Sequence, residues 1–158
     1  IPQLIDIHCD AVEFMDRASM ESIRNLEGAP AELPQRLDEH QKLMGLLFEF
    51  QAADKDGLAE KLDAFRTHVK PRAKSLSVIE LTQNKKKQAY LWKLRKGMYP
   101  AVAAVRGRGE AAMLEDVTFP LERLGAAMVE LQAMYGKKSS ANGISVGKAR
   151  GGTLHMGL

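Results

Sequence analysis

Arg95 and Tyr99 stand four residues apart in a segment of helical spacing, which places them on the same helix face. A planar guanidinium can hold a carboxylate through two parallel hydrogen bonds, and its charge offsets that of the anion. From periodicity alone, however, Arg95 is one more solvated cation on an amphipathic helix, and Tyr99 is equally well a core or rim aromatic. The pair therefore suggests carboxylate binding as one chemistry and an ordinary helix surface as the other.

Glu115 and Asp116 are adjacent carboxylates in a predicted strand. Neighbouring residues of a strand point to opposite faces, so these two cannot form a general acid–base pair at one site. Either one could orient Arg95 or a ligand, whereas a strand-end carboxylate that serves the fold is the commoner case.

Other reactive residue types are scattered. His8, His40 and His68 have no ligand spacing between them, and the run Lys85 to Lys87 at a predicted helix start is typical of a solvated face. The lone Cys9 cannot form an internal disulfide, and no secretory segment opens the chain. We therefore expect a reducing compartment, with the cytoplasm as the default.

Strands and helices alternate along the chain. Alternating polarity predicts strands over residues 11–17, 44–51 and 111–119, a shorter one over 76–81, and a last one that begins at 144, is interrupted by a glycine-rich stretch and resumes at 154. Apolar spacings of three and four predict helices over residues 20–26, capped by Ser19, and over 58–69, 85–105 and 120–135, with Pro100 bending or breaking the third. This order predicts an α+β fold, a ferredoxin-like antiparallel sheet with helices packed on one face.

The composition is that of one globular domain over residues 1–158, with 45% hydrophobic and 27% charged residues. The net charge of +3 is spread along the chain, so no nucleic-acid partner is expected. No apolar run reaches the roughly 18 residues that span a bilayer, which leaves peripheral membrane association open. The start at Ile1 and the end after a glycine-rich strand suggest a piece of a longer protein.

Three segments in order resemble a known family. AVEFMDR resembles the A-x-E-x-M-D-R strand of the C-terminal, substrate-side domain of FAD-linked oxidases, in the vanillyl-alcohol oxidase superfamily. LWKLRKGMYPAVAAVRGRGEAAMLEDVTFPLERL resembles that domain's W-x-x-R helix and its E-D-V-x-x-P-x-x-R-L segment, and GKARGGTLH resembles its glycine-rich strand near the flavin. Together they cover residues 11–155. The P-A-V-x-A-x-R stretch is most similar to members that also carry an iron–sulfur segment.

The resemblance implies roles for particular residues. Arg95 matches the arginine that binds the substrate's carboxylate, and Tyr99 matches a position where relatives place a hydroxyl for the substrate. Gly147 and Gly152 fall in the glycine-rich strand near the flavin, so the resemblance implies that they approach the cofactor. Glu115 and Asp116 are expected in supporting roles.

His155 matches the second histidine of the family's G-H-x-x-x-x-x-x-H pattern, in which two histidines and a later glutamate often hold a divalent metal. Here Lys148 replaces the first histidine and Thr153 replaces an asparagine. A protonated lysine cannot coordinate a metal, so no metal is expected. The resemblance then leaves His155 as the base that takes the substrate's hydroxyl proton, with a structural histidine as the alternative.

The expected function is substrate recognition in an FAD-dependent 2-hydroxy-acid dehydrogenase such as a D-lactate dehydrogenase. FAD is expected on a separate FAD-binding domain, since no G-x-G-x-x-G follows a strand here; the fragment alone would be inactive. An iron–sulfur cluster elsewhere in the full-length protein and a homodimer stay open. The alternative is a ferredoxin-like ligand-binding or regulatory module without catalysis, although the sequence lacks the aromatic strand motif of RNA-recognition domains.

Overall fold

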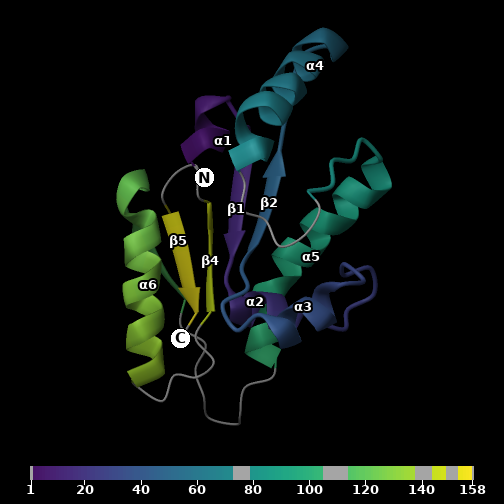
Figure 1. Cartoon of the computed structure of the whole chain (residues 1–158). Coiled ribbons are helices and arrows are strands. Elements are labelled where there is room, and N and C mark those ends of the chain that lie inside the picture. The colour runs from purple at the N-terminus through teal and green to yellow at the C-terminus, as the bar shows by residue number, and fades with distance from the viewer. Residues whose placement is uncertain (1, 73–78, 105–113, 138–143, 149–152, 158) are drawn as a thin grey trace.

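The computed structural model describes residues 2–72, 79–104, 114–137, 144–148 and 153–157. Within these residues the chain forms a five-stranded antiparallel sheet in the order β2-β1-β4-β5-β3. Helices pack on this sheet, as Figure 1 shows, and most of them lie in the connections between successive strands. The fold is therefore α+β, as the sequence predicts.

Two neighbouring strands, β1 (Ala11–Met15) and β2 (Gly45–Glu49), form one side of this sheet. Val12 lies opposite Phe48, and Glu13 lies opposite Leu47. Directly opposed residues point to the same face, so the alternation predicted for both segments is preserved in three dimensions. Val12 and Phe48 belong to one face, and Glu13 and Leu47 belong to the other.

The face that carries Val12 and Phe14 is covered by helices from three parts of the chain. These are α1 (Pro2–Asp6), the π-helical turn η1 (Phe65–Val69) that follows α4 (Lys55–Ala64), and α6 (Leu121–Lys137). Phe65 is fully buried against Phe48 and Phe50, with ring centroids 5.3 and 5.9 Å away. Aromatic packing of this kind fixes the helical layer on the sheet.

The opposite face of β1 carries a second core around Met15. Its helices are α2 (Arg17–Ser22), α3 (Leu33–Glu39) and α5 (Lys85–Ala104), which contribute Ile23 from just after α2, Leu33 and Leu37 from α3, and Met98 from α5. The four residues from Val12 to Met15 are all buried. The sequence led us to expect helices on one face of the sheet. Helices cover both faces instead, because a strand that is buried on both faces needs cover on both.

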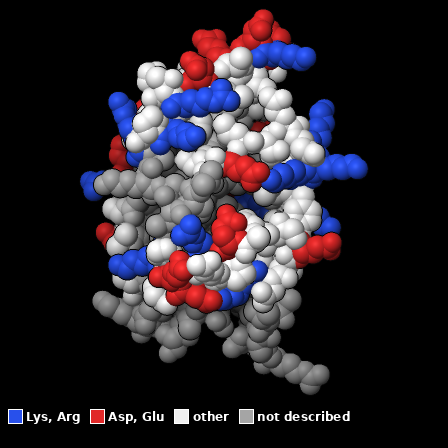
Figure 2. Space-filling view, turned by 45° about the vertical axis from the view of Figure 1, so that its right-hand side comes forward, with Lys and Arg blue, Asp and Glu red and all other residues white. Residues whose placement is uncertain are grey.

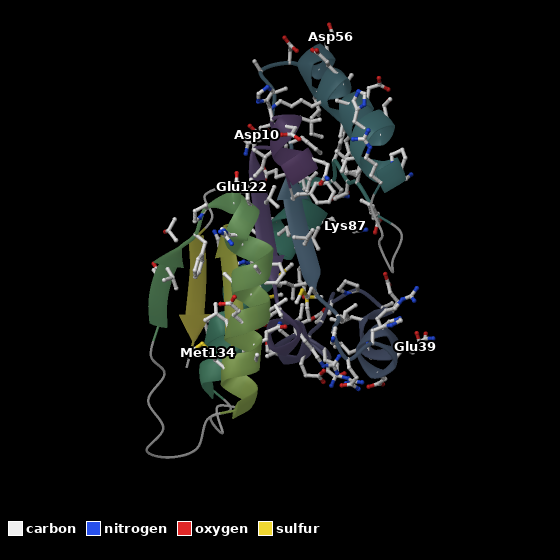
Figure 3. The ribbon with its side chains drawn as sticks, turned by 60° about the vertical axis from the view of Figure 1, so that its left-hand side comes forward. Asp10, Glu39, Asp56, Lys87, Glu122 and Met134 are labelled. Atoms are coloured by element: carbon white, nitrogen blue, oxygen red, sulfur yellow. The ribbon has the colours of Figure 1, made fainter. Side chains whose placement is uncertain are left out.

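The other side of the sheet consists of β4 (Ile144–Lys148), β5 (Thr153–Gly157) and β3 (Leu114–Thr118). The sequence suggested one interrupted strand at the C-terminus, but β4 and β5 are two antiparallel neighbours. Figure 3 shows α6 running in roughly the same direction as these strands, with Glu122 near its start and Met134 towards its end. The strand expected over residues 76–81 falls partly outside the described residues, and residues 79–84 form no strand.

Candidate functional site

Arg95 is joined to Glu13, which lies 82 positions earlier in the chain on β1. One carboxylate oxygen of Glu13, Oε2, accepts from Nε of Arg95 at 3.0 Å and lies 2.8 Å from Nη2. Glu13 is 5% exposed, and the side chain of Arg95 is 13% exposed. The guanidinium is therefore not a solvated helix cation: it is largely buried, paired and fixed against the sheet.

A second contact joins the same helix to the same sheet. The indole Nε1 of Trp92 donates to Oε2 of Glu49 at 2.7 Å, and Glu49 ends β2. Trp92 precedes Arg95 by three residues, so both side chains extend from one helix face. The W-x-x-R motif thus docks α5 on two carboxylates that share one face of β1 and β2.

The residues that follow Glu13 in the AVEFMDR segment hold the neighbouring helices in place. Asp16 caps α2, because its Oδ1 accepts from the backbone N–H of Ser19 at 2.9 Å and from the Ser19 hydroxyl at 2.7 Å. Ser19 therefore lies inside the helix and is not the cap that we predicted. Arg17 donates through Nη1 to the carbonyls of Leu37 and His40, both at 2.8 Å, at the end of α3.

A network of ion pairs at the protein surface joins α2 to α3. Arg24 is bonded to Asp38 and to Glu21, and these two carboxylates raise the pKa of Arg24 above its usual value. The guanidinium therefore stays charged at any physiological pH. This network supports the helices around Met15 and is separate from Arg95.

The N-terminus of α5 is fixed by Asn84, whose Oδ1 accepts from the backbone N–H groups of Lys86 and Lys87. The lysines of this run are exposed, as the sequence predicts. Pro100 lies inside α5 and does not end the helix, which continues to Ala104. A continuous helix through Pro100 keeps Trp92 and Arg95 on one rigid element.

The strand register places the other predicted residues relative to Glu13. Lys148 lies opposite Glu13 on one side and opposite Thr153 on the other. His155 is the partner of both Val146 and Asp116. Positions 13, 148 and 153 form one row across the sheet, and positions 15, 146, 155 and 116 form the row two residues away. Alternation assigns both rows to the face on which α5 packs.

For several of the predicted site residues, the structure describes little beyond their place in a strand or helix. Asp116 is exposed on β3, and Gly147 is buried in β4 between Phe14 and Leu154. Glu115 lies on β3 opposite Met156 and Tyr99 lies on α5, but the side chains of both are outside the described part of the structure, as are those of Lys148, Thr153 and His155. Gly152 lies outside the described residues altogether. Their proposed roles remain predictions.

Glu13 and Glu49 were missed as site residues by the sequence reasoning. One signal was present: each is a carboxylate within a strongly apolar strand, where an ionised group requires a partner. The sequence allowed Glu115 or Asp116 to orient Arg95 or a ligand; among the described contacts, Glu13 is the carboxylate that binds Arg95. Among the described residues no group of three or more His, Cys, Asp or Glu side chains is arranged to hold a metal ion.

The comparisons agree with this reading of the motifs. The family described as "FAD linked oxidases, C-terminal domain" matches residues 4–158, so the chain belongs to that family. No curated protein matches it significantly. Membership implies an oxidoreductase that uses FAD, with a substrate and an FAD-binding domain as partners. No helix of the described residues is long and apolar enough to cross a membrane.

The described residues fit the substrate side of such an enzyme. Arg95 supplies a fixed cation, and the strand rows bring positions 148, 153, 155 and 116 onto the same sheet face. The chain contains no G-x-G-x-x-G sequence to bind the diphosphate of FAD in the usual way.

Proposed function

We propose that this chain is the substrate-recognition domain of an FAD-dependent 2-hydroxy-acid dehydrogenase with a small, D-lactate-like substrate. The observation that carries the proposal is the buried, sheet-anchored guanidinium of Arg95 in a member of the FAD-linked oxidase family. Burial strengthens a charge-assisted bond to a carboxylate, because little water competes for the guanidinium. A domain of residues 1–158 that acts with a separate FAD-binding domain is part of this proposal.

The division of labour follows from the chemistry. FAD, when bound, accepts a hydride from the carbon that bears the hydroxyl. Arg95 binds and orients the substrate's carboxylate, with Tyr99 one turn along the same helix. His155 receives the hydroxyl proton, a task suited to a group that titrates near neutrality. Asp116 supports His155 in this proposal, which its place opposite His155 in the register of β3 and β5 favours. The P-A-V-x-A-x-R stretch supports a longer protein that also carries an iron–sulfur segment.

The first test uses the complete flavoprotein and its visible spectrum. D-Lactate, D-2-hydroxyglutarate and glycolate are added in turn under anaerobic conditions, and one of them should bleach the flavin band. Arg95→Lys keeps a positive charge beside Glu13 but loses the forked geometry. We expect kcat/KM to fall by at least about 100-fold, since charge-assisted hydrogen bonds contribute about 1.5–3 kcal/mol each.

Lys96→Ala is the matched control, because Lys96 is the adjacent cation on α5 and is exposed. It should leave kcat/KM within about twofold of wild type. A complete protein with no flavin band, even after reconstitution with FAD, would contradict the dehydrogenase and favour a ligand-binding module without catalysis. On the molecular face in Figure 2, acidic and basic side chains are interspersed, which gives no support to a nucleic-acid-binding module.

A further inference from the structure

We infer that Glu13 is the positioning residue of the substrate-binding arginine: it clamps one edge of the Arg95 guanidinium and presents the other edge to the carboxylate of the 2-hydroxy acid. This inference rests on the proposed function. It assigns to the A-x-E-x-M-D-R strand a part in substrate recognition, through Arg95.

The geometry of the pair carries the first step. Nε and Nη2 lie on one edge of the guanidinium plane, and both are within 3.0 Å of a single oxygen of Glu13. The remaining edge consists of Nη1 and the second hydrogen of Nη2. Within the described part of the chain, Nη1 has no hydrogen-bond partner. This second edge has the two parallel N–H groups that bind a carboxylate, and Glu13 uses the other edge.

Burial carries the second step. Glu13 is 5% exposed on a strand that is buried on both faces, so its carboxylate cannot follow a moving arginine. Arginine has several rotatable bonds, and their freedom opposes substrate binding unless it is removed beforehand. Glu13 removes this freedom in the absence of substrate. The guanidinium is then already oriented when the carboxylate arrives.

The third step separates orientation from helix docking. Trp92 and Glu49 also join α5 to the sheet, through an uncharged donor one turn before Arg95. This contact fixes the helix but does not touch the guanidinium. Changes at Glu49 therefore report what a disturbed helix–sheet contact does by itself, and changes at Glu13 report the additional effect on Arg95.

The test compares conservative variants in the complete flavoprotein. Glu13→Asp keeps the charge, so folding is preserved, but it withdraws the carboxylate by one methylene group. We expect KM for the hydroxy acid to rise about three- to tenfold, with kcat within about twofold, as for lost uniform binding. In Glu13→Gln the amide oxygen still accepts both hydrogen bonds, and KM should stay within about threefold. Glu13→Ala should raise KM by more than tenfold.

Two controls distinguish a loss of Arg95 orientation from a general disturbance of the structure. Glu49→Asp withdraws the acceptor of Trp92 by one methylene group, the same change as Glu13→Asp, and should leave KM within about twofold. The uncharged amide of the same hydroxy acid lacks the carboxylate, so its kcat/KM should not change in Glu13→Asp. Thermal melting of each variant checks that the fold is retained.

The outcomes separate the two proposals. If Arg95→Lys loses activity while Glu13→Asp and Glu13→Ala keep the wild-type KM, the positioning role is overturned and the proposed function stands. If Glu49→Asp raises KM as much as Glu13→Asp, or the amide is affected equally, the effect is structural and the positioning role is again overturned. If Arg95→Lys binds the acid like wild type, the proposed role of Arg95 and the inference fall together.

Discussion

At the scale of single residues, the pair of Glu13 and Arg95 also contributes to the free energy of unfolding. Removal of one partner from a buried pair leaves an uncompensated charge, whereas removal of both leaves an apolar contact. We expect Arg95→Met to lower the free energy of unfolding by about 3 kcal/mol and the double variant with Glu13→Leu to recover most of that loss. Urea denaturation of the single and double variants measures both values. A double variant as unstable as the sum of the singles would contradict a buried, mutually compensating pair.

Arg95 could be identified as a site residue from the sequence alone, whereas Glu13 could not. The sequence pointed to Arg95 because its motif is local and its helix has a clear period. The alternation of β1 also showed that Glu13 and Met15 share a face. It could not show which helix covers that face, because the contact joins residues 82 positions apart. Glu115 and Asp116 were considered instead, since they are the carboxylates of the recognisable segment that follows the helix.

At the scale of elements, Gly97 of α5 and Gly125 of α6 are expected to be dispensable for the fold. A Cβ added at Gly125 of α6 or at Gly97 of α5 would meet no atom of the described residues within 4 Å, apart from the adjoining chain of its own helix. Glycine inside a helix is less favourable than alanine by about 1 kcal/mol. We therefore expect Gly125→Ala to raise the melting temperature by roughly 2–4 °C, measured by circular dichroism.

Gly28 provides the opposite case and serves as the control. Its φ is +76°, and an added Cβ would lie 2.4 Å from Cε1 of Tyr90 on α5. Gly28→Ala should therefore lower the melting temperature. If Gly125→Ala were destabilising as well, an unrecognised contact of α6 would be implicated.

The helices with strong periods were predictable, and the short helices α1 and α3 were not. The helices at the positions of α4, α5 and α6 followed from their apolar spacing. The five residues of α1 and the seven of α3 are too short to show a helical period. From the sequence we interpreted the glycine-rich stretch from Gly147 as an interruption of one strand. The sequence pattern does not reveal that the chain reverses there, so that β4 and β5 are antiparallel neighbours.

At the scale of the whole molecule, β1 joins two hydrophobic cores, since Phe14 belongs to one and Met15 to the other. The described domain should therefore unfold in one cooperative transition. Trp92 is the only tryptophan and reports on the α5 side, whereas Phe65 is buried in the core on the opposite face. Phe65→Leu should cost about 1–2 kcal/mol and lower the midpoint seen by Trp92 fluorescence and the midpoint seen by far-ultraviolet circular dichroism equally. A Trp92 transition that stays at its wild-type midpoint while the circular dichroism transition moves would show that the two cores unfold independently. In that case β1 would not transmit stability between them, and the anchoring of Arg95 would depend on the α5 side alone.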